Sequence, residues 1–170
     1  MKTIIYVAVS VNGQILLADA DNYQTPVEVL QDCISLIHQT GNMVVGLKTY
    51  NLFFSNPNAK AAFDGIEITV LSNSKQPDIE GVTFLKNIKD VIDFYKSKGH
   101  TKIFVAGGAN TYQSFINEGH VDELYVNYLP VLTSGGAALM TNAALNKTFT
   151  LAAHKLISTE IYQLHYKTDL

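Results

Sequence analysis

Residues 103–111 read Ile103-Phe104-Val105-Ala106-Gly107-Gly108-Ala109-Asn110-Thr111, an apolar run followed directly by two glycines and then by polar residues. Two other segments end in the same style, residues 43–49 (Met-Val-Val-Gly-Leu-Lys-Thr) and residues 68–75 (Ile-Thr-Val-Leu-Ser-Asn-Ser-Lys). Short apolar runs that alternate with helical patterns indicate an α/β domain with a largely parallel core. Because parallel strands end at one edge of their sheet, we expect the three polar segments to meet where open α/β sheets bind ligands.

The same alternation extends along the whole chain. We expect strands at residues 4–9, 43–45, 67–71, 82–85, 102–106, 123–129, 149–155 and 161–167, and helices at residues 26–39, 46–54, 88–98 and 110–117. A short partner strand should begin near Ile15. The last two strands alternate in polarity and are expected to be antiparallel, so the sheet should be mixed. Residues 55–65 are the least structured stretch, either a plain surface loop or a mobile lid.

The first predicted helix carries signals at both of its ends. Thr25 is expected as the N-cap, Pro26 as the first helical residue and Glu28 as the acidic partner of a capping box. Gly41 is expected to end this helix.

The composition favours residues 1–170 as a single domain that needs no disulfide or metal to fold, since 47% of the residues are hydrophobic and 16% are charged. A net charge of −3 with scattered lysines argues against nucleic acid as a partner, and no apolar run is long enough to span a membrane. We see no signal peptide, and the single cysteine, Cys33, suits a reducing compartment, so we expect a cytoplasmic protein that acts on a small molecule. The histidines show no metal-binding spacing, and no metal site is expected.

All twelve basic residues are lysines, and the chain contains no arginine. Since arginine is the side chain that binds carboxylates and phosphates in a bidentate way, an anionic ligand must here be held by lysine, backbone N–H groups, hydroxyls or helix N-termini. Gly107 and Gly108 would let the backbone approach such a ligand closely. Each polar segment alone is better explained as a turn or a solvated loop, and only the three together make a ligand site an equal explanation. The glycine spacing matches neither a GxGxxG fingerprint nor a P-loop.

Several stretches resemble the dihydrofolate-reductase-like superfamily, and most closely the reductase domain of the riboflavin-biosynthesis deaminase-reductase and its stand-alone relatives. They are Tyr6-Val-Ala-Val-Ser-Val-Asn-Gly-Gln-Ile15, Val45-Gly-Leu-Lys-Thr-Tyr50, Val105-Ala-Gly-Gly-Ala-Asn-Thr-Tyr112, and Val121-Asp-Glu-Leu-Tyr125 with Leu129-Pro-Val-Leu-Thr-Ser-Gly-Gly136. Residues 70–74 also resemble a segment of dihydrofolate reductases proper. The resemblance implies a three-layer fold, in which a mixed, mostly parallel twisted sheet with antiparallel C-terminal strands is flanked by helices.

The resemblance also implies an NADPH site at the sheet edge, with the nicotinamide near Ala8 and Ile15, the pyrophosphate over residues 107–111, and the adenosine end at residues 71–74. The implied cofactor residues are Ala8, Ile15, Gly46, Lys48, Thr49, Leu71, Ser72, Asn73, Ser74, Lys75, Gly107, Gly108, Ala109, Asn110, Thr111 and Tyr112. A cis peptide between Gly107 and Gly108 is implied as well.

Cofactor choice is affected by Leu47, which stands where family members usually carry an arginine that grips the 2′-phosphate of NADPH. Lys48 and Lys75 remain available, together with the hydroxyls of Ser72 and Ser74. Because lysine is a point charge without the arginine fork, we expect only a modest preference for NADPH, with NADH possible. The alternative is that both lysines are plain surface charges.

On the substrate side, Glu28 and Asp32 lie one turn apart on the first helix, where dihydrofolate reductases carry the carboxylate that contacts the pterin. The alternatives are the capping box for Glu28 and an exposed helix position for Asp32. The missing arginine argues against folate and less against a sugar phosphate. We therefore expect an NADPH-dependent reductase that transfers a hydride to a C=N or C=O carbon of a pterin- or pyrimidine-ribosyl-like substrate, with Glu28, Asp32 or water supplying the proton.

Two alternatives remain open, dihydrofolate reductase proper and a nucleotide-binding module without turnover. The resemblance further implies a homodimer. Strands 123–129 and 161–166 are hydrophobic and aromatic, and either could pair across a two-fold axis if it lay at a sheet edge.

Overall fold

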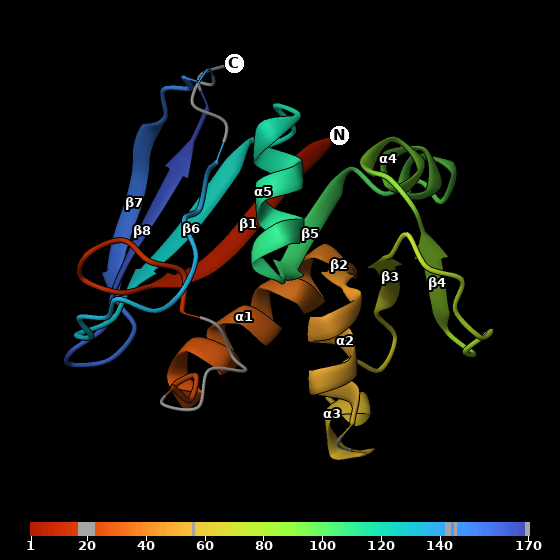
Figure 1. The fold of residues 1–170 in the computed structure, drawn as a ribbon, viewed down its shortest axis with the longest axis horizontal. Coiled ribbons are helices and arrows are strands. Elements are labelled where there is room, and N and C mark those ends of the chain that lie inside the picture. The colour runs from red at the N-terminus through yellow and green to blue at the C-terminus, as the bar shows by residue number, and fades with distance from the viewer. Residues whose placement is uncertain (17–22, 56, 142–143, 145, 169–170) are drawn as a thin grey trace.

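Helices and strands alternate along most of the chain in the computed structural model, which describes residues 1–16, 23–55, 57–141, 144 and 146–168 (Figure 1). In chain order the elements are β1 (Lys2–Val9), α1 (Val27–Thr40), β2 (Asn42–Gly46), α2 (Leu47–Phe54), α3 (Pro57–Ala61), β3 (Glu67–Leu71), β4 (Val82–Leu85), α4 (Ile88–Ser97), β5 (Lys102–Gly107), α5 (Ala109–Asn117), β6 (Glu123–Tyr128), β7 (Thr150–Leu156) and β8 (Tyr162–Lys167).

All of these strands belong to one sheet, in the order β4-β3-β2-β5-β1-β6-β8-β7. Neighbouring strands pair in parallel along the run β4-β3-β2-β5-β1-β6, whereas β8 is antiparallel to both β6 and β7. Figure 1 shows β4 and β7 at opposite sides of the molecule, with β1 and β5 near the middle. This topology confirms the predicted mixed and mostly parallel sheet.

The two faces of the sheet carry separate hydrophobic cores because successive residues of a strand point to opposite sides. Ile5 and Val7 of β1 pack with α4 and α5, where Val91 and Phe115 are fully buried. The intervening Ile4 and Tyr6 pack with α1 and α2. The central strands are therefore apolar on both faces, which is why they read as continuous hydrophobic runs in the sequence. The predicted three layers are confirmed.

The start of α1 differs from the prediction. Pro26 has extended dihedrals (φ −55°, ψ 143°) and occupies the cap position, so the helix begins at Val27 and no side chain caps it. The capping box predicted from Thr25 and Glu28 is therefore wrong. The end of the helix is as predicted, because Gly41 adopts a left-handed conformation (φ 76°) and its N–H donates to the carbonyl of Ile37.

Two other local expectations are corrected, and a third is only partly covered. Residues 55–65 contain the short helix α3, and Phe63, just after this helix, is buried, although residue 56 lies outside the described part of the chain. Ile15 forms antiparallel bridges to Val9 and Ala137, and the rest of the short partner strand expected from there falls on residues 17–22, which lie outside the described residues. Neither β6 nor β8 lies at a sheet edge, because the C-terminal hairpin inserts β8 between β6 and β7.

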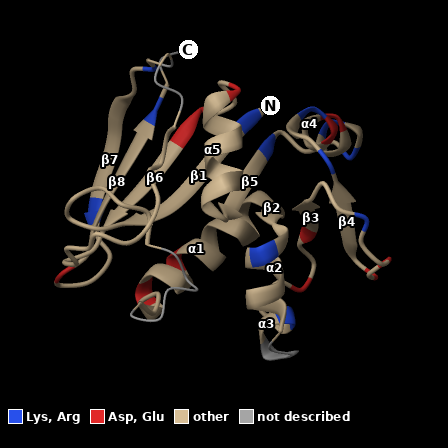
Figure 2. Cartoon of the chain, viewed as in Figure 1, with Lys and Arg blue, Asp and Glu red and all other residues tan. Residues whose placement is uncertain are grey.

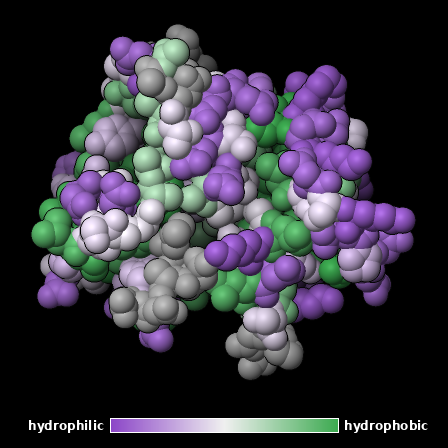
Figure 3. Space-filling model, in the orientation of Figure 1, coloured by the Kyte–Doolittle hydropathy of each residue, from purple (hydrophilic) through white to green (hydrophobic). Residues whose placement is uncertain are grey.

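The molecular surface is mixed in character. Figure 2 shows acidic and basic residues dispersed over several elements, without a stripe of one sign on the face in view. In Figure 3 hydrophilic residues gather over α4 and β4, whereas apolar residues are exposed at the side of β7. None of the helices within the described residues combines the length and apolarity needed to cross a membrane.

Candidate functional site

The ends of parallel strands and the segments that follow them enclose a polar cavity of about 450 Å³. β2 leads into α2, β5 leads into α5, and β3 and β4 contribute the segments just beyond their last residues. Ten of the residues implied by resemblance line this polar cavity, namely Gly46, Lys48, Thr49, Leu71, Ser72, Asn73, Gly108, Ala109, Asn110 and Thr111. The three polar segments singled out in the sequence therefore do meet at one edge of the sheet.

Two glycines bring the walls of the polar cavity close together. A Cβ on Gly46 would lie 2.6 Å from the hydroxyl of Thr111, and a Cβ on Gly108 would lie 3.1 Å from the hydroxyl of Thr49. Gly108 also has a positive φ of 84°, which residues with side chains rarely adopt. The floor of the cavity is thus bare backbone beside two hydroxyl groups. The cis peptide expected between Gly107 and Gly108 is wrong, because no cis peptide occurs in the described chain.

Helices α2 and α5 both begin at this cavity. Their N-cap residues, Gly46 and Gly108, have no side chain that could accept the first backbone N–H groups. The N-terminal end of a helix carries a partial positive charge and N–H groups without an intrahelical partner. Two such ends beside the hydroxyls of Thr49 and Thr111 suit an anionic group such as a phosphate.

A second, apolar cavity of about 120 Å³ adjoins the first. Lys48, Thr49, Gly108 and Ala109 line both cavities, which are therefore contiguous. Four further residues implied by resemblance line the apolar cavity alone, namely Ala8, Ile15, Gly107 and Tyr112.

Tyr112 connects α5 to the central strand of the sheet. Its hydroxyl donates to the carbonyl oxygen of Tyr6 at 2.7 Å. Burial raises the pKa of the Tyr112 phenol, which therefore keeps its proton at neutral pH. Burial likewise raises the pKa of the Cys33 thiol in the same cavity, to about 12, so this cysteine is not a thiolate nucleophile.

Ser74 and Lys75 are exposed and do not line either cavity, whereas Leu71, Ser72 and Asn73 line the polar cavity. The Ser74 hydroxyl lies 3.0 Å from the hydroxyl of Ser72 and accepts a hydrogen bond from Gln76 at 2.7 Å. These contacts stabilise the turn after β3. A ligand role for Ser74 and Lys75 stays a prediction without support from this geometry.

The two candidate carboxylates of α1 also lie away from the described cavity walls. Glu28 is exposed. The Asp32 carboxylate receives hydrogen bonds from Tyr6 (3.1 Å) and Gln163 (2.8 Å) and pairs with Lys155 (2.5 Å). α1 instead presents Val29, Leu30 and Cys33 to the apolar cavity. The catalytic roles expected for Glu28 and Asp32 thus remain predictions, and Asp32 is occupied in a network that joins α1 to β1, β7 and β8.

Sequence reasoning missed a group of residues that line the polar cavity from β4, α4 and α5. They are Lys86, Asn87, Ile88, Ser114 and Glu118. The strand at residues 82–85 was predicted, and the rule applied to the other strand ends would have pointed to Lys86. Ser114 and Glu118 could have been found from the helical spacing of α5, because they lie one and two turns beyond Asn110, with Glu118 as the C-cap residue.

No group of three or more His, Cys, Asp or Glu side chains that could hold a metal ion occurs among the described residues. The site is built from backbone, hydroxyl and ammonium groups around a parallel sheet edge. A mixed sheet between two helical layers, with a cavity at the carboxyl ends of its parallel strands, defines an α/β domain of the kind that binds its ligand at this edge.

The sequence profile of the RibD C-terminal domain family matches residues 56–163. The chain belongs to this family, and it is thereby a reductase-type protein of the riboflavin-biosynthesis class. No curated protein sequence matches the chain.

Solved structures share the fold at low sequence identity. A proposed riboflavin biosynthesis protein from Shewanella sp. PV-4 is 21% identical, with a TM-score of 0.76 over 100% of both chains. A pyrimidine reductase-like protein from Corynebacterium diphtheriae is 15% identical, with a TM-score of 0.77 over 99% of this chain and 92% of the other. RibD from Acinetobacter baumannii is also 15% identical, with a TM-score of 0.77 over 99% of this chain and 58% of the longer protein.

Proposed function

We propose that the chain is a nicotinamide-nucleotide-dependent reductase that transfers a hydride to a C=N or C=O carbon of a small pyrimidine-ribosyl-like substrate. The observation that carries this proposal is the pair of contiguous cavities at the carboxyl edge of the sheet, one polar and one apolar. A dinucleotide needs both kinds of environment, because its phosphates are anionic and its nicotinamide ring must be shielded from water. The similarity of the fold to that of a pyrimidine reductase-like protein supports the substrate class.

The residues of the polar cavity fit the phosphate-bearing part of NADPH. The N-terminal N–H groups of α2 and α5 and the hydroxyls of Thr49 and Thr111 would bind the pyrophosphate. Leu71, Ser72 and Asn73 would bind the adenosine end. Gly46 and Gly108 contribute bare backbone to this site, and a Cβ at these positions would press against the Thr111 and Thr49 hydroxyls that would contact the phosphates.

The apolar cavity fits the nicotinamide ring and the reacting carbon. Ala8 and Ile15 would contact the ring, and Val29 and Leu30 add apolar side chains to the lining of the same cavity. When bound, the nicotinamide supplies the hydride. The protein then contributes orientation and a dry environment.

The proposed reaction also needs a proton for the reduced substrate. The described walls of the apolar cavity contain no carboxylate and no imidazole. The tyrosines and the cysteine that line it have raised pKa values because they are buried, so they hold their protons. Asp32 is engaged by three donors elsewhere. We therefore favour water as the proton source over Glu28 or Asp32.

The absence of a carboxylate or an imidazole from the described walls of the apolar cavity, where Lys48 is the charged group, favours a second candidate, a nucleotide-binding module without turnover. Fluorescence titration with NADPH, followed by an NADPH oxidation assay with dihydrofolate and with the pyrimidine ribosyl intermediate of riboflavin biosynthesis, separates the two. Binding with oxidation of the pyrimidine substrate supports the reductase. Binding without any oxidation supports the module, and the absence of binding would contradict both.

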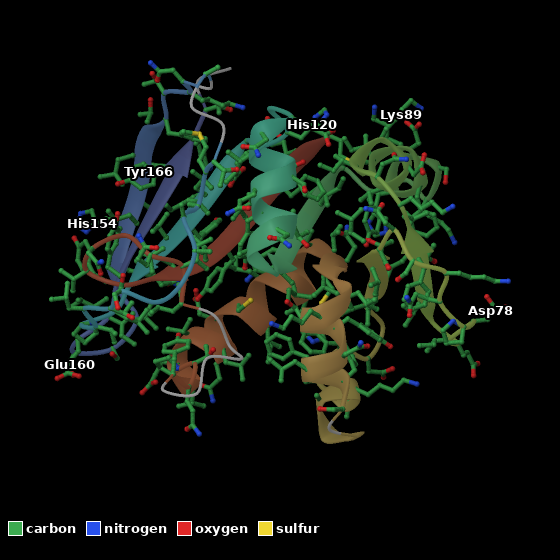
Figure 4. All side chains as sticks on the ribbon, in the orientation of Figure 1. Asp78, Lys89, His120, His154, Glu160 and Tyr166 are labelled. Carbon is green, nitrogen blue, oxygen red and sulfur yellow. The ribbon has the colours of Figure 1, made fainter. Side chains whose placement is uncertain are left out.

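We also propose that the chain forms a homodimer through β7 and acts in the cytoplasm. β7 is an edge strand that is exposed along its whole length, with Leu151 at 49% and Leu156 at 63% exposure. In Figure 4 the side chains of His154 and Glu160 lie at this outer side of the molecule. An exposed edge with unpaired backbone groups is a ready site for a second copy of the chain. A dimer mass by light scattering that falls to the monomer mass in the Leu151→Lys/Leu156→Lys variant is the expected result, and a monomeric parent protein at micromolar concentration contradicts it.

A further inference from the structure

The turn after β1 contains the pair Asn12-Gly13, which is the one Asn-Gly pair in the sequence. Both residues are exposed, and Gly13 has a positive φ of 79°. A Cβ added to Gly13 would meet no atom within 4 Å beyond its chain neighbours, so this side of the turn is open. When glycine follows asparagine, the glycine nitrogen can approach the side-chain amide carbon closely, because glycine has no side chain to obstruct it and a flexible backbone.

The side chain of Asn12 connects this turn to the segment that follows β6. Its amide nitrogen donates to the carbonyl oxygen of Thr133 at 2.9 Å, and its amide oxygen accepts from the hydroxyl of Ser10 at 2.8 Å and from the backbone N–H of Thr133 at 3.4 Å. These hydrogen bonds of the Asn12 side chain are called the Asn12 bridge below. The two connected segments lie at the same end of the sheet, because β1 and β6 are parallel neighbours (Figure 1).

Backbone contacts extend along the same two segments. The N–H of Val11 donates to the carbonyl of Val131 at 2.8 Å, and the N–H of Ile15 donates to the carbonyl of Ala137 at 2.8 Å. A Cβ on Gly136 would lie 2.5 Å from the carbonyl oxygen of Ile15, so the segments are in close contact. Ile15 also lines the apolar cavity, which places the Asn12 bridge close in sequence to a wall of that cavity.

The folded turn holds both reacting groups of the Asn-Gly pair in hydrogen bonds. The N–H of Gly13 donates to the carbonyl oxygen of Ser10 at 2.9 Å. For its nitrogen to attack the side chain of Asn12, this bond must break and the amide must rotate out of the Asn12 bridge. The bonds from Asn12 to Thr133 are exposed at the surface, so the turn opens at a lower free-energy cost than the buried strands. The rate of attack should therefore follow the population of the open turn.

We propose that Asn12 is a site of spontaneous deamidation and that the Asn12 bridge controls the rate of this modification. The backbone nitrogen of Gly13 forms a bond to Cγ of Asn12, the Cγ–Nδ2 bond breaks, and the amide nitrogen leaves as ammonia with the hydrogen of the attacking nitrogen. Water then adds to one of the carbonyl carbons of the resulting cyclic imide and breaks its bond to the Gly13 nitrogen. Addition at Cγ leaves aspartate, and addition at the backbone carbonyl carbon leaves isoaspartate. Water is the co-reactant, and no atom is oxidised or reduced.

Either product replaces the Asn12 amide by a carboxylate. A carboxylate has no N–H to donate to the carbonyl oxygen of Thr133 and brings a negative charge towards it, so this part of the Asn12 bridge is lost. The neighbouring backbone contacts of Val11 and Ile15 should then open more often.

Peptide mapping by mass spectrometry of the folded protein, kept in a mildly alkaline buffer, tests the proposal. Asn12 should deamidate before Asn73, which is also exposed but is followed by Ser74. Its reaction should be slower in the folded protein than in the same protein unfolded in urea. The proposal is overturned if the folded protein keeps Asn12 intact while the unfolded chain reacts to completion, if the two rates are equal, or if Asn73 reacts first.

Ser10→Ala removes one hydrogen bond of the Asn12 bridge and should raise the rate of deamidation at Asn12 by about two- to tenfold. Ser97→Ala is the matched control, because it removes a hydroxyl that donates to the carbonyl of Phe94 within α4. Its rate at Asn12 should equal that of the parent. Equal rates in Ser10→Ala and Ser97→Ala would contradict the role of the Asn12 bridge.

Asn12→Asp tests the consequence of the modification, because it carries the side chain of one product. Hydrogen exchange measured by NMR should be faster at the amides of Val11 and Ile15 in this variant than in the parent. Unchanged exchange at both amides would contradict a structural role for the Asn12 amide.

Discussion

Replacing Gly46 by alanine tests whether the floor of the polar cavity is as tightly packed as the structure indicates. Gly46 has φ −74° and ψ 150°, dihedrals that alanine adopts without strain, so any effect must come from contact of the added methyl group. That Cβ would lie 2.6 Å from the Thr111 hydroxyl, about 0.8 Å short of the 3.4 Å at which ordinary contact begins. Thr111 is only 3% exposed and sits in the first turn of α5, so it cannot swing into solvent.

Overpacking of this kind destabilises a protein by about 1–3 kcal/mol. For a domain of this size the midpoint of thermal unfolding should fall by about 2–12 °C. Urea unfolding followed by circular dichroism measures the free energy, and NADPH titration of the folded variant should show weaker binding because the methyl group narrows the phosphate-binding floor. Gly135→Ala is the matched control, since its Cβ would meet the nearest atom at an ordinary 3.5 Å, and its cost should stay within about 0.5 kcal/mol.

A double-mutant cycle with Thr111→Ala identifies the cause. Removing the hydroxyl removes the clash, so Gly46→Ala should cost about 1 kcal/mol less in that background than in the parent. Additive effects of the two substitutions, or a Gly46→Ala protein as stable as Gly135→Ala, would refute the reasoning.

Three further predictions concern the hydrogen bonds of Tyr6, the protonation of His165 and the reduction of dihydrofolate. Tyr6→Phe should lower the free energy of unfolding by about 1–3 kcal/mol, because the hydroxyl donates to the buried carbonyl of Val29 and to Asp32; urea unfolding that matches the parent contradicts this. Burial lowers the pKa of His165 in the folded protein despite its hydrogen bond to Glu123. As pH falls below about 6.5, the imidazole gains its proton in the unfolded chain before it does so in the folded protein, and the free energy of unfolding therefore decreases. His165→Gln should therefore flatten the dependence of unfolding free energy on pH between about 7 and 5, and an unchanged slope argues against it. Dihydrofolate should be a poor substrate, since a missing arginine clamp costs about 1.5–3 kcal/mol, roughly ten- to a hundredfold in affinity, and turnover at rates typical of dihydrofolate reductases would overturn this expectation.

The strand ends were predictable because each is a local signal. The change from apolar to polar residues at positions 45–46, 71–72 and 106–107 lies within a few residues, and parallel pairing brings such positions to one edge whatever the order of the strands. The end of α1 at Gly41 was local as well, since glycine alone accepts the left-handed conformation without strain.

What could not be predicted depends on distant contacts. The surroundings of Asp32 are set by Gln163, 131 residues away in sequence, and by Lys155, 123 residues away. The edge position of β7 follows from the insertion of β8 beside β6, an order that the polarity pattern of the two strands does not encode. The sequence favoured Thr25 as the N-cap and Pro26 as the first helical residue. Pro26 instead has extended dihedrals and is itself the cap, so the helix begins one residue later than expected.

The most direct test of the central claim is an amide chemical-shift titration of the isotope-labelled protein with NADPH. If the carboxyl edge of the sheet binds the dinucleotide, the amides of Gly46, Ser72 and Gly108 should shift in a saturable way with one dissociation constant. The amide of Lys102, at the opposite end of the same sheet, should not move. Shifts confined to that opposite end, or no saturable shifts at all at millimolar NADPH, would contradict the account.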